Sequence, residues 1–278
     1  MQTSHIDNRL IQILAQHQPA ALAAGSFLPQ QGLSGQTLIV GEGHAKAVAR
    51  AEPHLSMPWV SRRREYAILK QLQGQGLGPT PVVWASPWLV VEHLPGNALS
   101  AAETGEHIAE VADLLARLHH QPLCGQRISM TDLLAQYWQR CQTHSPQWLR
   151  RWRRLQRQGE PKPLRLALLH MDVHGGNVIA TAQGLRLIDW EYAGDGDIAL
   201  ELAAASLMTP LRPAQQQRLI ERYAQCCALS PERLARQVQR WKPWLRLLMA
   251  CWYQLRAEQT QDAELQALAA RAWLSRSD

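Results

Sequence analysis

The segment between residues 166 and 191 constrains the fold most, because it carries a β-type pattern inside a region that otherwise repeats with helical spacing. An apolar run at 166–169 leads into a polar loop, and Gly175-Gly176 then precede two short apolar runs around a turn at 182–184. This order predicts a strand, a loop and a β-hairpin. Helical spacing resumes at Ile198 and continues toward the C-terminus. The chain is therefore predicted to be an α+β protein.

The hairpin brings polar side chains of distant sequence position together. A hairpin centred on Gln183 places Asn177 opposite Asp189, and directly opposed residues have Cβ atoms about 4.5–5.5 Å apart. Asp172 lies five residues before Asn177, at the same end of the hairpin. Amide and carboxylate oxygens are the ligands that Mg²⁺ takes in proteins. The spacing therefore predicts a magnesium site at this end.

Two other metal sites fit the sequence less well. His170, Asp172 and His174 alternate and could bind Zn²⁺ or Fe²⁺ on one strand face. The glycine pair breaks the strand directly after them, however, and the hairpin acceptors then go unexplained. A calcium loop beginning at Asp195 would need Glu at its twelfth position, which is Ser206.

The N-terminal third has a different texture from the rest. It opens with helical spacing over residues 1–23, and a helix over 61–72 begins at Ser61, a good N-cap residue. Short apolar runs separated by turn residues predict the strands of a small antiparallel sheet at 37–40, 47–50, 81–84 and 88–92. Pro95-Gly96 marks the boundary. We expect a sheet-rich lobe over 1–95 and a larger helical lobe over 96–278, with a helix break at Pro243.

Composition excludes several classes of protein. The five cysteines include no C-x-x-C pair, which favours buried thiols in a reducing compartment over a disulfide framework. No apolar run reaches the roughly 18 residues of a membrane span, and the N-terminus lacks the pattern of a secretory signal. We therefore expect a cytoplasmic protein without a membrane partner. Oligomeric state stays open.

Charge is concentrated in one stretch. The net charge is +6, and residues 150–165 hold seven basic residues and one acid, which equals the whole excess. Leu149, Trp152 and Leu155 recur every three residues there, as in an amphipathic helix on a core. Because no nucleic-acid-binding motif accompanies the stretch, the pattern favours a solvated helix face over a nucleic-acid surface.

The polar insertion resembles a known superfamily. His170-x-Asp172-x₄-Asn177, followed by Ile188-Asp189-Trp190-Glu191, resembles the catalytic and metal-binding segments of aminoglycoside phosphotransferases and choline kinases. The resemblance runs over nearly the whole chain. It implies a protein-kinase-like fold of two lobes, with ATP and Mg²⁺ as cofactors and a small-molecule alcohol as phosphoryl acceptor.

The resemblance also assigns roles to residues. Asp172 would orient the acceptor hydroxyl and take its proton, Asn177 and Asp189 would hold Mg²⁺, and His170 would be structural. The residues expected to bind ATP are Ser34, Gly35, Gln36, Arg50, Glu65, Glu92 and Leu94. Among them, Arg50 would contact phosphate and pair with Glu65, and the segment from Glu92 to Leu94 would meet adenine through its backbone.

The chain departs from protein kinases in ways that matter. It has no G-x-G-x-x-G loop, and Arg50 stands where kinases place a lysine, although Arg binds in a planar fork and Lys as a point charge. Asp189-Trp190-Glu191 replaces D-F-G, and no activation segment follows. These differences favour a small-molecule kinase.

The acceptor is expected to be a cationic alcohol, because acidic residues cluster near the polar loop. The residues expected to bind it are Trp190, Glu191, Asp197, Trp241, Trp244 and Trp252. A cation over an indole face gains about 0.5–2 kcal/mol. Trp241, Trp244 and Trp252 also fall at helical spacing, which favours packing in the core for any single one of the four tryptophans, while we expect at least one of them to touch the acceptor.

Two rival functions remain open at this point. The same scaffold could phosphorylate choline, ethanolamine or an aminoglycoside. From another class, the basic stretch could belong to a nucleic-acid-binding protein with a degenerate kinase fold. The retained set of Asp172, Asn177 and Asp189 argues against degeneration.

Overall fold

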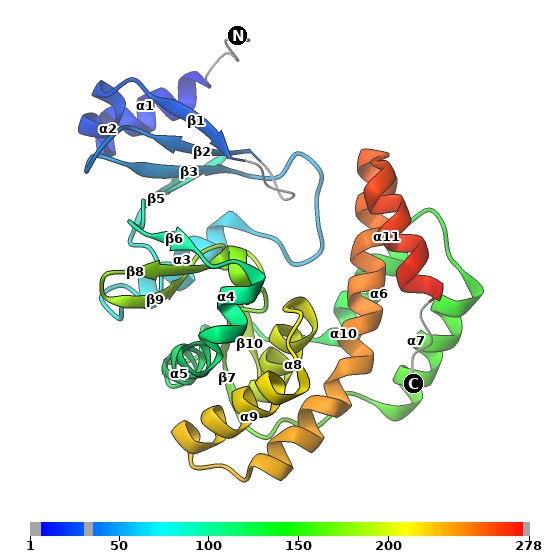
Figure 1. Cartoon of the computed structure of the whole chain (residues 1–278). Helices are drawn as coiled ribbons and strands as arrows, with labels where there is room; N and C mark the ends of the chain where they lie inside the picture. The colour runs from blue at the N-terminus through cyan, green and yellow to red at the C-terminus, as the bar shows by residue number, and fades with distance from the viewer. Residues whose placement is uncertain (1–6, 31–35, 275–278) are drawn as a thin grey trace. The chain divides into compact units, whose positions relative to one another are not determined.

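The computed structural model describes residues 7–30 and 36–274, which fall into two compact units (Figure 1). The first unit holds the described part of Met1–Ala98 together with Ile179–Tyr192, and the second holds the described parts of Leu99–Val178 and Ala193–Asp278. The sequence placed Ile179–Tyr192 with the helical lobe. Backbone hydrogen bonds place it in the first unit instead, since Leu187 N–H donates to Leu77 O at 2.8 Å.

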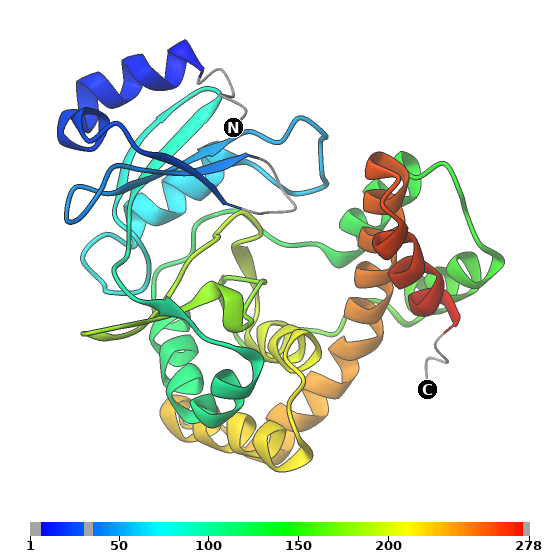
Figure 2. The ribbon, with the colours of Figure 1, turned by 45° about the horizontal axis from the view of Figure 1, so that its top comes forward.

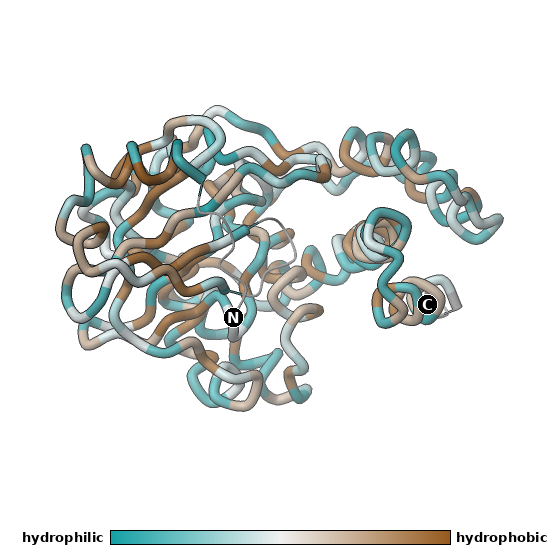
Figure 3. Tube along the Cα trace, turned by 90° about the horizontal axis from the view of Figure 1, so that it is seen from above, coloured by the Kyte–Doolittle hydropathy of each residue, from teal (hydrophilic) through white to brown (hydrophobic). Residues whose placement is uncertain are grey.

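The first unit is built on a five-stranded antiparallel sheet in the order β1-β2-β3-β5-β4. Its strands are β1 (Phe27–Gln30), β2 (Thr37–Val40), β3 (Ala47–Ala51), β4 (Pro81–Ala85) and β5 (Trp88–Glu92). Four of these match the predicted runs, and their residues are predominantly hydrophobic (Figure 3). Strand β1 was not predicted, because it is a mostly exposed edge strand interrupted by Pro29.

Alternation along the strands gives this sheet two different faces. Ala47, Ala49 and Val90 are buried in one core with Leu10 and Leu14 of α1 (Asn8–His17). The residues between them on β3 and β5 therefore point to the other face. Helix α2 (Pro19–Ala23) follows α1, and α3 (Arg62–Gln71) lies across the sheet from both (Figures 1 and 2). Helix α3 begins as predicted at Ser61, whose hydroxyl accepts a hydrogen bond from Arg64 N–H at 3.3 Å.

A second, three-stranded sheet carries the predicted hairpin. Its order is β6-β8-β9, with β6 (Asn97–Ala98) antiparallel to β8 (Val178–Thr181) and β9 (Gly184–Leu187) beside β8. At the turn the Thr181 hydroxyl donates to Gly184 O at 2.8 Å, and Gly184 has φ of 105°, a value that favours glycine. The hairpin is confirmed. The exact opposition of Asn177 and Asp189 stays a prediction.

The second unit is mainly helical. Its helices are α4 (Ala101–Glu106), α5 (Ile108–His119), α6 (Met130–Arg140), α7 (Pro146–Gln158), α8 (Ile198–Met208), α9 (Pro213–Cys227), α10 (Pro231–Thr260) and α11 (Ala263–Leu274). Strand β7 (Leu166–Leu169) pairs antiparallel with β10 (Gly194–Asp197). Helix α8 is central, and every residue from Ile198 to Ser206 is buried. None of the helices in the described residues combines the length and hydropathy that a membrane crossing needs.

The predicted break at Pro243 is wrong. Helix α10 runs from Pro231 to Thr260 with Pro243 inside it. Proline removes one backbone hydrogen bond and strains the preceding turn. Packing of α10 against α6, α8 and α11 outweighs that local cost.

Candidate active site

In the first unit, Arg50 joins three carboxylates. Its side chain is buried, with Nη1 paired to Glu65 and Nη2 paired to both Asp189 and Glu191, the last at 3.2 Å. The expected pair of Arg50 and Glu65 is therefore present. A planar guanidinium with several donors makes this bridging possible, whereas an ammonium point charge has no such fork.

A second buried arginine completes this ion cluster. Arg62 Nη1 lies 2.7 Å from Glu65 Oε2 and 2.8 Å from Glu191 Oε2, and its Nε donates to Ala51 O at 3.1 Å. Sequence reasoning missed Arg62, although its i,i+3 spacing to Glu65 on a helix was a usable signal. When all three carboxylates are ionised, two cations and three carboxylates leave one negative charge in excess. We call these five residues, Arg50, Arg62, Glu65, Asp189 and Glu191, the ion cluster.

One of the three carboxylates in the ion cluster is accessible to solvent. The Asp189 side chain is 30% exposed, whereas Glu65 and Glu191 are 2% exposed. Asp189 also has φ of 65°, an uncommon conformation for a non-glycine residue that is found preferentially at functional sites. A carboxylate at the accessible edge of a cluster with surplus negative charge suits a hard cation such as Mg²⁺.

The charges shift the ionisation of the cluster. Burial acts to lower the pKa of Arg50, but Asp189, Glu65 and Glu191 outweigh it and raise that pKa above its ordinary value. Burial and the Asp189 carboxylate raise the pKa of Glu191 to about 7, against the opposing pull of Arg50 and Arg62. Glu191 was expected to contact the acceptor. The structure gives it a place in the ion cluster, and its contact with acceptor stays a prediction.

The second unit contributes the polar loop after β7. His170 is fully buried, and its Nδ1 accepts a hydrogen bond from Asp172 N–H at 3.2 Å; the structural role expected of it stays a prediction. Asn177 Nδ2 donates to Asp172 O at 3.0 Å and to Asp172 Oδ2 at 2.7 Å. Gly175 lets the loop lie close to Leu99 and Thr104, because a Cβ there would lie 2.5 Å from Leu99 O. The loop thus holds Asp172 at its backbone N–H, at its backbone carbonyl and at one carboxylate oxygen.

These bonds also orient the amide of Asn177. Both acceptors on Asp172 face its nitrogen, so the nitrogen and oxygen are distinguished by the network. No hydrogen bond from the described residues reaches Asn177 Oδ1. The atom left to meet a cation is therefore the oxygen, as a magnesium ligand requires.

The residues of the alternative metal site, His170, Asp172 and His174, differ in their surroundings. Within the described residues, no group of three or more His, Cys, Asp or Glu side chains is placed to hold a metal ion. His170 is buried, while the His174 side chain is 37% exposed with Nε2 at 3.8 Å from Asp172 Oδ2. The three alternating residues thus lie in different surroundings.

The buried carboxylate of Glu201 anchors the polar loop after β7. Glu201 of α8 accepts hydrogen bonds from His170 N–H at 2.5 Å and from Met171 N–H at 2.9 Å, one on each oxygen. Met171, next to Asp172, has φ of 68°. Burial acts to raise the pKa of Glu201, but the His119 imidazole, with Nε2 at 3.6 Å from Glu201 Oε2, and the hydrogen bond from His170 N–H outweigh it, and the pKa lies below its ordinary value. Sequence reasoning counted Glu201 among nearby acids only. Its position in an otherwise apolar helix was the signal for a specific buried partner.

We expect Glu201→Gln to lower kcat about tenfold, with KM values changed by less than about twofold. The amide can accept only one of the two loop N–H groups and leaves the other unsatisfied, at about 1–3 kcal/mol. Steady-state kinetics separate kcat from KM and thus distinguish lost positioning of Asp172 from lost binding. Asp113→Asn is the matched control in the same unit, because the Asp113–Arg222 pair is exposed. An unchanged kcat in Glu201→Gln would contradict the anchoring role.

Both carboxylate oxygens of Asp197 accept hydrogen bonds inside the second unit. Oδ2 accepts from Gln237 Nε2 and from Trp241 Nε1, both at 2.8 Å, and Oδ1 accepts from Leu164 N–H at 3.1 Å. The residue is 1% exposed. Asp197 therefore joins the segment before β7 and helix α10 to the start of α8, and the expected contact with acceptor stays a prediction.

The four candidate tryptophans are in different surroundings. Trp190, Trp241 and Trp244 are buried, and Trp190 Nε1 donates to Leu187 O at 3.0 Å. Trp252 is only partly buried and lies beside Tyr253, with ring centroids 5.4 Å apart. Burial favours packing for the first three. Trp252 packs against the apolar cluster of Ala257, Leu265 and Ala269, and the acceptor contacts of all four tryptophans stay predictions.

The structure describes only some of the remaining residues that are predicted to bind ATP. Ser34 and Gly35 lie outside the described residues. Gln36 is exposed, and its carbonyl accepts from Ala51 N–H at 2.9 Å. Glu92 ends β5, with its N–H donating to Thr80 O at 2.9 Å, and Leu94 follows in the segment that leads to β6. Their contact with ATP stays a prediction.

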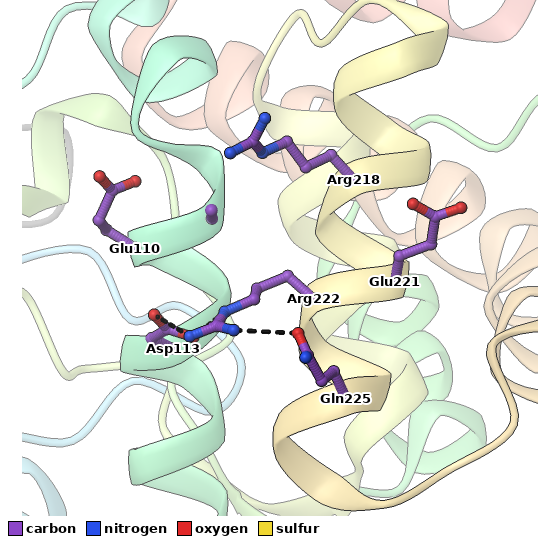
Figure 4. Close-up of a pocket in the computed structure, with 7 residues that line it drawn as sticks. Glu110, Asp113, Arg218, Glu221, Arg222 and Gln225 are labelled. Atoms are coloured by element: carbon purple, nitrogen blue, oxygen red, sulfur yellow. Dashed lines mark hydrogen bonds and ion pairs between the residues drawn. The ribbon is translucent and has the colours of Figure 1, made fainter.

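A groove of about 790 Å³ lies elsewhere in the second unit, between α5 and α9 (Figure 4). It holds the ion pair of Asp113 and Arg222, at 2.6 Å, and Arg222 also donates to Gln225 at 3.0 Å. None of the predicted site residues lines it. The groove is therefore no part of the candidate active site.

Comparisons with known proteins agree with this geometry. The model of the phosphotransferase enzyme family matches residues 28–236. A thiamine kinase of Salmonella paratyphi C is 42% identical over 269 residues, which cover 96% of this chain and 93% of the relative. Among solved structures, choline kinase LicA from Streptococcus pneumoniae has a TM-score of 0.76 at 18% identity, covering 98% of this chain and all of that one. LicA in complex with AMP has a TM-score of 0.71 at 17% identity, covering 97% and 98%.

The two kinds of comparison carry different weight. At 17–18% identity the solved structures speak to the fold alone, and they confirm the predicted protein-kinase-like α+β architecture. The family model covers well over half of the chain, and the relative matches almost all of it. The chain belongs to the phosphotransferase enzyme family.

Proposed function

We propose that this chain transfers the γ-phosphoryl group of ATP to the primary hydroxyl of thiamine, giving thiamine phosphate and ADP. The observation that carries the proposal is the 42% identity to a thiamine kinase over 96% of the chain. The segments 32–35, 168–177, 187–202 and 241–244 also resemble bacterial thiamine kinases. A small-molecule kinase that salvages thiamine is the function that fits these segments.

Asp172 is the group that would act on the acceptor. The thiamine hydroxyl oxygen attacks the γ-phosphorus, its proton passes to the Asp172 carboxylate, and the bond to the bridging oxygen of ADP breaks. Asn177 Nδ2 donates to Asp172, Asp172 N–H donates to His170 Nδ1, and His170 N–H donates to Glu201. These hydrogen bonds support this role, because they hold Asp172 and the residues before it in one geometry. Such positioning supplies much of the rate enhancement in phosphoryl transfer.

Arg50 and the two oxygen donors would bind the nucleotide. Arg50 offers a guanidinium that three carboxylates keep in one orientation, a good match for phosphate oxygens. Mg²⁺, when bound, neutralises negative charge on the ATP phosphates. Asn177 Oδ1 and the Asp189 carboxylate would hold it, and the surplus negative charge of the ion cluster supports that assignment.

The test is an ADP-release assay with thiamine, choline, ethanolamine and an aminoglycoside, each with ATP and Mg²⁺. We expect kcat/KM for thiamine to exceed that for each alternative by at least about 100-fold, because a site built for one acceptor leaves polar groups unpaired with another. Preferred turnover of choline or an aminoglycoside would overturn the substrate. No Mg²⁺-dependent ADP release with any acceptor would favour the degenerate-kinase alternative.

A further inference from the structure

The face of α7 that points to solvent is lined with arginine. Arg150, Arg153, Arg154 and Arg157 are all exposed. They stand at i, i+3, i+4 and i+7, which places them on one side of the helix. We call these four residues the arginine stripe.

The stripe is presented on a well-packed helix. On the opposite face Trp148 is fully buried and stacks on Trp273 with ring centroids 5.1 Å apart, and it also packs edge-on against Trp138 at 5.3 Å. The fifth arginine of α7, Arg151, donates to Ala272 O at 3.1 Å and so belongs to the packing of α11. The four stripe arginines have no such internal use.

The charge of the stripe is not balanced locally. Helix α7 contains no acidic residue, and the one acid that follows it, Glu160, accepts a hydrogen bond from Thr131 N–H at 2.7 Å. Across residues 7–30 and 36–274, none of the four arginines forms an ion pair. Like charges at i,i+3 and i,i+4 destabilise a helix, and a merely solvated face normally interleaves both signs. Helix stability therefore does not explain the pattern.

The chemistry of the stripe points to one partner. Every basic residue of α7 is Arg, whose fork binds phosphate oxygens in pairs. From Arg150 to Arg157 the stripe extends about 10 Å along the helix, a length over which a nucleic-acid strand offers several phosphates. A membrane-surface helix also needs exposed apolar side chains to insert, and the exposed large hydrophobic residues of the described chain, Ile11, Leu28, Leu55, Leu123 and Leu166, all lie outside α7.

We propose that the arginine stripe binds the phosphate backbone of nucleic acid, independently of base sequence. This adds a binding surface to the enzyme and does not depend on which alcohol it phosphorylates. The sequence alone favoured a solvated face. The structure changes that balance, because it shows four accessible arginines on a packed helix whose nearest acid in sequence is used elsewhere.

The test measures fluorescence anisotropy of a labelled single-stranded RNA of mixed sequence at several salt concentrations. Four phosphate contacts predict a slope of log K against log salt of about −2.8, or about 50-fold weaker binding for a fourfold rise in salt. The variant R150Q/R153Q/R154Q/R157Q is expected to bind at least about tenfold more weakly at low salt and to lose most of the slope. The pair R150Q/R157Q should lose about half of it.

The matched control removes the same charge from other exposed positions, R127Q/R218Q/R233Q/R236Q. It is expected to keep the wild-type slope, and ADP release with thiamine is expected to be unchanged in all variants. Three results would overturn the proposal. They are no binding by the wild-type chain at low salt, an equal loss in the stripe and control variants, and binding to anionic phospholipid vesicles without binding to RNA.

Discussion

Asp172→Asn is expected to bind ATP as the unsubstituted chain does and to lose kcat by about 10³-fold. A positioned general base contributes about 10²–10⁴-fold to proton transfer, and an amide cannot take the acceptor proton. The substitution is nearly isosteric. Its carbonyl oxygen can still accept the hydrogen bond that Asn177 Nδ2 donates to Asp172 Oδ2 at 2.7 Å, so the loop is expected to keep its geometry.

Two measurements separate chemistry from binding in this variant. Titration calorimetry with ATP and Mg²⁺ reports nucleotide affinity, and single-turnover phosphorylation of thiamine reports the chemical step. Asp132→Asn, at an exposed position in the first turn of α6, is the matched control and should leave both unchanged. Full activity in Asp172→Asn would remove Asp172 as the base.

Arg50→Gln is expected to lower the free energy of unfolding by about 3–5 kcal/mol. Removing one partner of a buried ion network leaves its counter-charges uncompensated, which is the costly case. Here Glu65 and Glu191 would keep their pairs with Arg62, Asp189 would lose its pair with Arg50, and the excess negative charge of the ion cluster would rise from one to two. KM for ATP is expected to rise as well, because the proposed phosphate contact is lost.

Arg50→Lys tests whether charge or geometry matters. Lysine restores the positive charge but not the planar fork that reaches three carboxylates. The free energy of unfolding of Arg50→Lys should therefore fall between those of wild type and Arg50→Gln. Urea denaturation monitored by tryptophan fluorescence gives the three values. Arg222→Gln is the control, because its pair with Asp113 is exposed and worth about 0–1 kcal/mol. A loss in Arg50→Gln no larger than in that control would contradict the ion cluster's role.

Much of the architecture followed from local pattern. The hairpin after the polar loop, the cap at Ser61 and four strands of the first sheet were predictable, because spacing and turn residues report burial and chain direction directly. Strand β10 was not, since Gly194–Asp197 has no strand-like composition and takes its form from pairing with β7. The helix break predicted at Pro243 was wrong for the same reason, because packing of the helix outweighed the local preference of proline.

The candidate site shows the same difference between what the local sequence predicts and what tertiary packing determines. The sequence by itself determined which side chains we propose for the chemistry, Asp172, Asn177 and Asp189, because their types and spacing are local properties of one segment. Only the tertiary structure decided what holds them. Glu201 lies 31 residues from His170, and Arg62 lies 129 residues from Glu191, so no local pattern links either pair. Hydrophobic periodicity says that a residue is buried, but the partner of a buried charge is chosen only when distant elements pack together.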